Sequence, residues 1–212
     1  MKTIAAVCLF VAFQDKPFEA FGTMGADGFT PDGKKEAIKI ESKEKLEGRV
    51  WLKGVLKDGA LKVADVERFP KDLAAAADGK AFSLTLTGVS PWCDHMPMMR
   101  EGERRQYLTL SVTLKNKTGK PLEVDLPRAF FSFDEKLEGS PVTGISVRGE
   151  DGAGSGVTKI SLKAGEERQV PLRGDNLYDE DRHDQKLFVT IVAAAGGERL
   201  LVRAAGVVLM TQ

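Results

Sequence analysis

The chain has 212 residues, of which 42% are hydrophobic and 29% are charged, and its 31 basic and 31 acidic residues cancel. This composition is typical of a globular protein, and the 22 glycines make the chain rich in turns. A net charge of zero gives no overall electrostatic reason to bind nucleic acid or an anionic membrane, so any binding surface must be local.

The N-terminus, residues 1–13, has the pattern of a secretory signal peptide. Lys2 precedes an apolar stretch that is too short to cross a bilayer, so we expect export and no transmembrane segment. Phe10 is bulky where a cleavage site after Ala12 needs a small residue, and a buried N-terminal strand is the alternative. The predicted location is periplasmic or extracellular.

Two cysteines exclude a disulfide scaffold. Removal of the leader would remove Cys8 and leave Cys93 as the single thiol of the mature chain. Such a residue is expected to be buried, paired with another chain or bound to a metal.

The N-terminal part predicts a small β-rich segment. Residues 14–35 are rich in Gly, Asp and Pro and suggest an irregular arm or linker. Residues 36–79 suggest a small hairpin unit, because Asp58-Gly59 separates two apolar runs. A short connecting helix is expected after Pro70, before Gly79.

Residues 80–212 predict a β-sandwich. Phe82, Leu84 and Leu86 alternate with polar residues, as does the run at 107–114, which is the pattern of half-buried strands. Further strands are expected at 122–126, 129–133, 142–147, 157–162, 168–172, 187–193 and 200–209. Short strands separated by turns at this spacing predict an all-β chain with an immunoglobulin-like β-sandwich.

The run at 107–122, with its turn at Asn116-Lys117-Thr118-Gly119, resembles the strand, turn and strand of secreted bacterial immunoglobulin-like domains. The segment Lys163-Ala164-Gly165-Glu166 resembles the lead into a later strand of the same domains. The nearest such group is the telokin-like extracellular domains of bacterial lipoproteins, and the resemblance covers about residues 81–212. It implies a binding or accessory module, and it carries over no site residue.

Scarce residue types gather at residues 91–99. This stretch holds one of two Trp, one of two Cys and three of six Met. Soft sulfur donors beside an imidazole suit Cu(I), which predicts a candidate metal site. Its candidate ligands are Cys93, His95, Met96, Met98 and Met99. The alternative is that the Trp and Met side chains pack over an open end of the sandwich.

Two other segments contain residue types found in binding sites. Residues 175–184 hold five carboxylates that could bind Ca²⁺, but their spacing is not that of an EF-hand, and a solvated loop is favoured. His183 could approach Cys93 and His95 only if both loops lie at the same end of the sandwich. The Gly-rich residues 148–156 lack the ending of a phosphate-binding loop and predict a flexible loop.

Catalysis finds little support in the sequence, because the serines lack a nucleophile-elbow motif and the chain has two histidines. We therefore expect an exported, non-catalytic binding or accessory module whose partner is an unknown protein or small ligand. A periplasmic copper-binding protein is the alternative, and a hydrolase with an unrecognised site is the third possibility.

Overall fold

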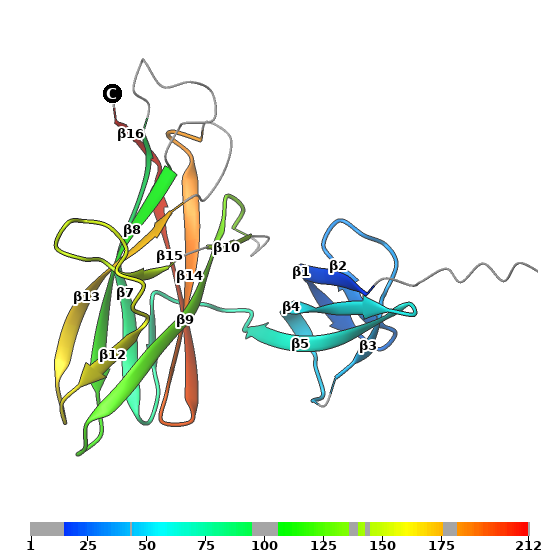
Figure 1. The fold of residues 1–212 in the computed structure, drawn as a ribbon, viewed down its shortest axis with the longest axis horizontal. Helices are drawn as coiled ribbons and strands as arrows, with labels where there is room; N and C mark the ends of the chain where they lie inside the picture. Colours follow the sequence, from blue (N-terminus) through cyan, green and yellow to red (C-terminus); the bar gives the residue numbers. More distant parts are fainter. Residues whose placement is uncertain are drawn as a thin grey trace, which may run out of the picture. The chain divides into compact units, whose positions relative to one another are not determined.

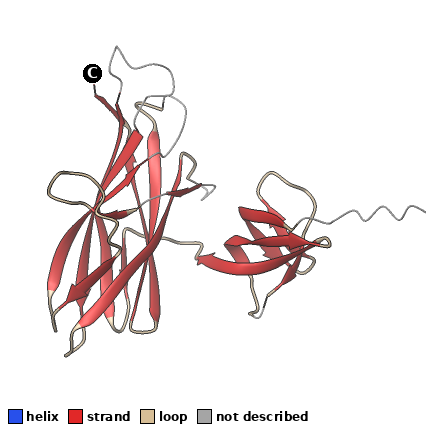
Figure 2. Cartoon of the chain, in the orientation of Figure 1, coloured by secondary structure: helices blue, strands red, loops and turns tan. Residues whose placement is uncertain are grey.

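The computed structural model describes residues 15–42, 44–94, 106–135, 140–142, 145–175 and 182–211. All regular secondary structure in these ranges is β-strand (Figure 2), which confirms the all-β prediction. The chain divides into two compact units, Met1–Lys71 and Asp72–Gln212. A search of the described residues found no helix with the length and apolar character to cross a membrane.

The N-terminal unit is a small barrel of five strands (Figure 1). The strands are β1 (Lys16–Gly25), β2 (Gly28–Pro31), β3 (Lys39–Glu41), β4 (Gly48–Lys57) and β5 (Ala60–Phe69). They lie in the order β2-β1-β4-β5-β3, with β3 and β5 parallel and the other pairs antiparallel. An antiparallel bridge between Phe29 and Ile38 brings β2 back to the start of β3. The result is a five-stranded barrel of the partly open kind found in OB-folds.

The barrel core explains why residues 16–31 form strands where the sequence predicted an irregular arm. The buried residues Phe29, Leu46, Val50, Leu52 and Leu61 pack together, and Phe18 and Ala20 lie against them. A Cβ at Gly22 would lie 2.6 Å from the Phe29 ring, so this glycine allows close packing and does not mark a turn. The arm prediction was wrong because the Gly, Asp and Pro residues mark only the short turns at 26–27 and 32–33, while the residues beside those turns form strands.

The predicted hairpin at Asp58-Gly59 is present and joins β4 to β5. Asp58 and Gly59 have φ angles of 50° and 78°, as a two-residue hairpin turn with two left-handed positions requires.

The C-terminal unit is a sandwich of two sheets (Figure 1). One sheet has the order β11-β13-β8-β7-β16, with β6 also paired to β7. The other has the order β10-β9-β14-β15, with β12 also paired to β9. The strands of the first sheet are β6 (Ala76–Asp78), β7 (Phe82–Asp94), β8 (Gln106–Asn116), β11 (Ser146–Val147), β13 (Glu167–Asp175) and β16 (Leu209–Thr211). Those of the second are β9 (Leu122–Ser132), β10 (Ser140–Val142), β12 (Lys159–Leu162), β14 (Lys186–Ala195) and β15 (Glu198–Val207).

One hydrophobic core fills the space between the two sheets. The predicted inward faces are confirmed: Phe82, Leu84 and Leu86 of β7 are buried, as is the even-numbered face of β8. The second sheet contributes Val124, Leu187, Val189, Ile191 and Val202 to the same cluster. A β-sandwich preceded by a smaller β-rich unit is therefore the observed architecture.

The predicted helix between Pro70 and Gly79 is wrong. Ala76–Asp78 forms β6, which pairs with β7. The carbonyls of Ala74 and Ala75 accept hydrogen bonds from the backbone N–H groups of Arg203 and Leu86, at 2.8 and 2.7 Å. These tertiary bonds use the carbonyls that a helix would need, so the helix propensity of alanine is overridden.

Candidate functional site

A β-bulge in β7 decides which side chains at the end of this strand, residues 91–94, point outward. Two residues of β7, Thr87 and Gly88, oppose Ser111 alone, and Thr87 Oγ1 donates to the Ser111 carbonyl at 3.0 Å. Because side chains alternate along a strand, the extra residue reverses the faces beyond it. Cys93 consequently points into the core and Trp92 points outward.

The outer face of the first sheet carries two aromatic rings and a guanidinium side by side. Trp92 and Tyr107 form a cross-strand pair with ring centroids 6.1 Å apart and ring planes 13° apart. The guanidinium carbon of Arg173 lies 4.1 Å from the Tyr107 ring centroid, within cation–π range. We refer to Trp92, Tyr107 and Arg173 as the aromatic row. All three side chains are partly exposed.

The Gly-rich turn helps to position Arg173. The Gly149 N–H donates to the Ala153 carbonyl at 2.7 Å, and Arg148 and Gly154 form an antiparallel bridge. The turn is thus closed by its own backbone, and Arg173 Nη1 donates to the Gly152 carbonyl at 3.4 Å. The flexible loop predicted from the sequence is a hydrogen-bonded turn beside the aromatic row.

An apolar side chain continues this surface on the neighbouring strand, where Leu209 of β16 pairs with Trp92 and is 45% exposed. Farther along the same sheet face, four residues beyond Tyr107 on β8, Gln169 Nε2 donates to Ser111 Oγ at 2.7 Å.

Residues 91–99 and 175–184, which the sequence suggests as binding loops, begin at the same end of the sandwich. Tyr107 pairs with Trp92 on one side and with Asp175 on the other, and Asp184 N–H donates to the Val208 carbonyl at 2.9 Å. Figure 1 shows the ends of β7, β8 and β16 together near the C-terminus. The strands that flank the two segments therefore place both at one end of the sandwich, which an approach of His183 to Cys93 would require.

The predicted copper ligands are divided by the structure. His95, Met96, Met98 and Met99 lie outside the described residues, so a metal site formed by them stays a prediction. Cys93 is 0% exposed and belongs to the core cluster with Leu108 and Val208. His183 is exposed, with Nε2 3.9 Å from Asp184 Oδ2. In the described part of the chain, three or more His, Cys, Asp or Glu side chains nowhere gather in a metal-binding group.

The sequence did not reveal Tyr107 and Arg173 as members of a site. Polar and apolar residues alternate along β8, and this alternation places Tyr107 on the polar face. That position was the one sign in the sequence that the Tyr107 ring lies outside the core. The partnership with Arg173 depends on the pairing of β13 with β8, and the outward direction of Trp92 depends on the bulge. A single sequence does not show which residues of neighbouring strands are paired, so it reveals neither the Tyr107–Arg173 contact nor the outward direction of Trp92.

The N-terminal barrel presents a different surface. In OB-type barrels the face of the second and third strands is the usual ligand surface. Here those strands expose Lys39 and Glu41, and Thr30 is partly exposed. The aromatic ring on β2, Phe29, is fully buried inside the barrel, so β2 and β3 offer no exposed ring for base stacking.

No protein-family model matches the chain, and no curated protein matches it. Two solved structures are similar to parts of it at 12% sequence identity. One is a FixG-related protein from Vibrio parahaemolyticus, with a TM-score of 0.37 over 60% of this chain and 95% of that protein. The other is an uncharacterized β-sandwich protein from Clostridium difficile 630, with a TM-score of 0.36 over 65% of this chain and 97% of that one. At such low identities and TM-scores, neither likeness supports an inference about function.

Proposed function

We propose that this chain is an exported, non-catalytic binding module whose sandwich takes its partner on the aromatic row. The observation that carries the proposal is the juxtaposition of Trp92, Tyr107 and Arg173 on one outer sheet face. Trp, Tyr and Arg are the residue types that contribute most of the binding energy at protein interfaces.

The row is also held in place before any partner arrives. Tyr107 lies between the ring of Trp92 and the guanidinium of Arg173, which is itself bonded to the Gly152 carbonyl. Side chains fixed in this way lose little conformational entropy on binding. With Leu209 exposed beside it, the row favours a protein partner, and a small ligand with an apolar face is the second possibility.

We also propose that the sandwich is related to the telokin-like extracellular domains and that the chain is exported. The resemblance of residues 81–212 to telokin-like extracellular domains is consistent with an accessory module. The apolar leader at residues 1–13 supports export to the periplasm or the extracellular space. A non-catalytic role is favoured because the thiol of Cys93, a side chain that could act as a nucleophile if it were accessible, is enclosed in the core.

Intrinsic fluorescence tests this function, because the chain has two tryptophans, one in each unit. In a Trp51→Phe protein the emission comes from Trp92 alone, and in a Trp92→Phe protein it comes from Trp51 alone. Each is titrated with chromatographic fractions of the cell-envelope extract of the cells that make the protein. We expect a fraction that shifts the emission of Trp51→Phe and leaves that of Trp92→Phe unchanged. If no fraction shifts Trp92, or if both proteins respond equally, the aromatic row is not the binding surface.

A further inference from the structure

In the N-terminal barrel, β5 extends well past the end of its parallel partner β3. The β3–β5 ladder ends at the pair Glu41 and Lys62, whereas β5 continues to Phe69 with β4 as its partner. Along the β3 side, the segment Val63–Phe69 of β5 therefore has no strand paired to it in the described residues. A sheet edge of this kind is able to accept another strand.

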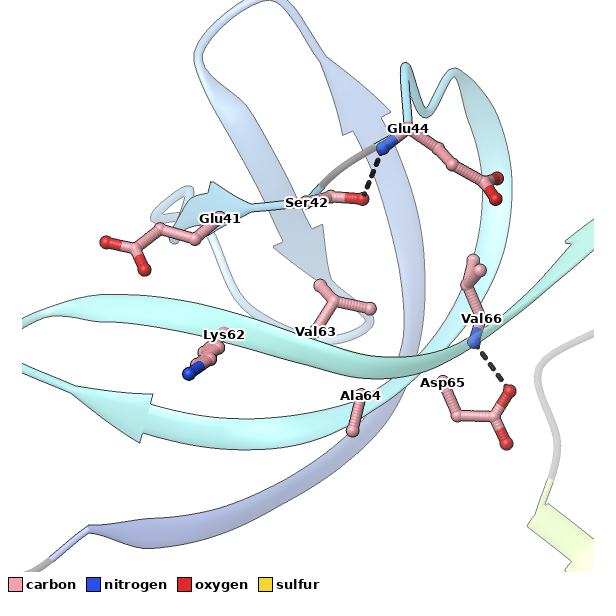
Figure 3. A pocket seen from close by; sticks show the side chains of 8 residues that line it. All are labelled: Glu41, Ser42, Glu44, Lys62, Val63, Ala64, Asp65 and Val66. Atoms are coloured by element: carbon pink, nitrogen blue, oxygen red, sulfur yellow. Dashed lines mark hydrogen bonds between the residues drawn. The ribbon is translucent and has the colours of Figure 1, made fainter.

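A groove lies at this position. It has a volume of about 580 Å³ and is lined by residues of the β3 end and of β5: Glu41, Ser42, Glu44, Lys62, Val63, Ala64, Asp65 and Val66. This volume lies within the range of ligand sites, about 300–1,000 Å³. Figure 3 shows Val63 and Val66 directed from β5 toward the segment that carries Ser42, so the floor of the groove is apolar.

Both ends of the groove are closed by interactions within the barrel. The Glu41–Lys62 pair ends the ladder at one end. At the other end, Arg68 Nη2 donates to Glu44 Oε2 at 2.8 Å and to the Lys45 carbonyl at 3.2 Å. Five residue steps separate Val63 from Arg68, a length of about 17 Å along a strand. The space matches one short extended segment.

The backbone and the charges of the lining indicate what such a segment would be. The Val66 N–H donates to Asp65 Oδ1 at 2.9 Å, so its present partner is a side chain that a strand carbonyl could replace. The lining holds the carboxylates of Glu41 and Asp65 against the single ammonium of Lys62, while the third carboxylate, that of Glu44, is paired with Arg68. The remaining surplus of one negative charge favours a cationic occupant.

We infer that this groove binds an extended peptide of a partner protein by strand addition to β5. Valine-sized side chains of the peptide contact Val63 and Val66, and its lysine or arginine residues lie beside Glu41 and Asp65. In this binding mode the main-chain hydrogen bonds provide affinity and alternate side chains provide specificity. The site is independent of the aromatic row, which belongs to the other unit.

The test is a titration of the ¹⁵N-labelled full chain with a capped pentapeptide in which lysine and valine alternate. We expect backbone shift changes at Glu41, Ser42, Glu44 and Val63–Val66. The same peptide with N-methyl groups on its central amides should not bind, because it cannot complete the ladder. Absence of binding at millimolar peptide, equal binding of the N-methylated peptide, or shifts at the aromatic row in place of the groove would each overturn the inference.

A matched pair of charge reversals tests the role of the carboxylates. Glu41→Lys should weaken peptide binding about tenfold, whereas Glu36→Lys, an equal charge change at an exposed residue outside the lining, should leave it unchanged. Equal effects of the two variants would show a general charge effect and overturn the groove assignment.

Discussion

The side-chain amide of Asn116 donates a hydrogen bond to the carbonyl of Lys163, with an N–O distance of 2.8 Å. The same Nδ2 donates to the Lys120 carbonyl at 2.7 Å, and Asn116 Oδ1 accepts from the Thr118 N–H at 2.8 Å. Asn116 is fully buried. This residue therefore joins the two segments on which the resemblance to secreted immunoglobulin-like domains rests. The shared pattern marks a structural joint and not a binding site.

Replacing Asn116 with alanine should destabilise the sandwich by roughly 3 kcal/mol, because it removes three hydrogen bonds made by a fully buried side chain. Urea unfolding followed by far-UV circular dichroism measures the loss. Lys120→Ala is the control, since Lys120 takes part through its backbone carbonyl. Equal stabilities of Asn116→Ala and the control would contradict the role given to this amide.

We expect the stability of the sandwich to fall in acid because of Glu198. Its carboxylate accepts the backbone N–H groups of Ala81 and Lys80, each at 2.9 Å, and these bonds lower the pKa of Glu198 below its ordinary value. A lowered folded-state pKa gives stability that is present above the unfolded-state pKa of about 4.3 and is lost as the pH falls through the folded value. Glu198→Gln should thus be less stable than the natural protein at neutral pH, and the difference should shrink in acid.

Urea unfolding between neutral pH and pH 2 measures this difference, and NMR titration gives the pKa of Glu198 directly. Glu150→Gln, on an exposed turn, is the matched control. A Glu198→Gln protein whose stability follows that of the natural protein at every pH would refute the prediction.

Cys93 is expected to act as a core residue and not as a metal ligand. Because its side chain is fully buried, Cys93→Ala should lower the unfolding free energy by about 1 kcal/mol and leave the affinity for Cu(I) unchanged. An anaerobic Cu(I) titration of the folded variant measures this. A tenfold loss of Cu(I) affinity in Cys93→Ala would show that the thiol reaches the metal, and Met96→Leu with Met98→Leu tests the thioether ligands separately.

The sequence was sufficient for the parts of the fold that depend on local alternation and turn chemistry. The faces of Phe82 to Leu86 and of β8, and the hairpin at Asp58-Gly59, are of this kind. It failed where tertiary contacts decide the outcome. Position 22 needs a glycine because the Phe29 ring packs against it, and Ala74 does not enter a helix because its carbonyl accepts the backbone N–H of Arg203.

The aromatic row shares one residue, Trp92, with the stretch at 91–99 that the sequence singled out. A metal site formed by the residues of that stretch stays a prediction. One inserted residue in β7 reverses the outward face, so Trp92 became a surface residue and Cys93 a core residue. Tyr107 and Arg173 come from strands far from Trp92 in the sequence, and strand register alone brings them together.

Site-specific photo-crosslinking tests the central claim, that the aromatic row is a binding surface, most directly. A photoreactive phenylalanine analogue replaces Tyr107 in one protein and Thr113 in the control, since Thr113 lies on the same face of β8 but away from the row. Both are expressed in the cells that make the protein and irradiated there. We predict a discrete crosslinked product from position 107 that position 113 does not give. No product from position 107, or the same products from both positions, would contradict the account.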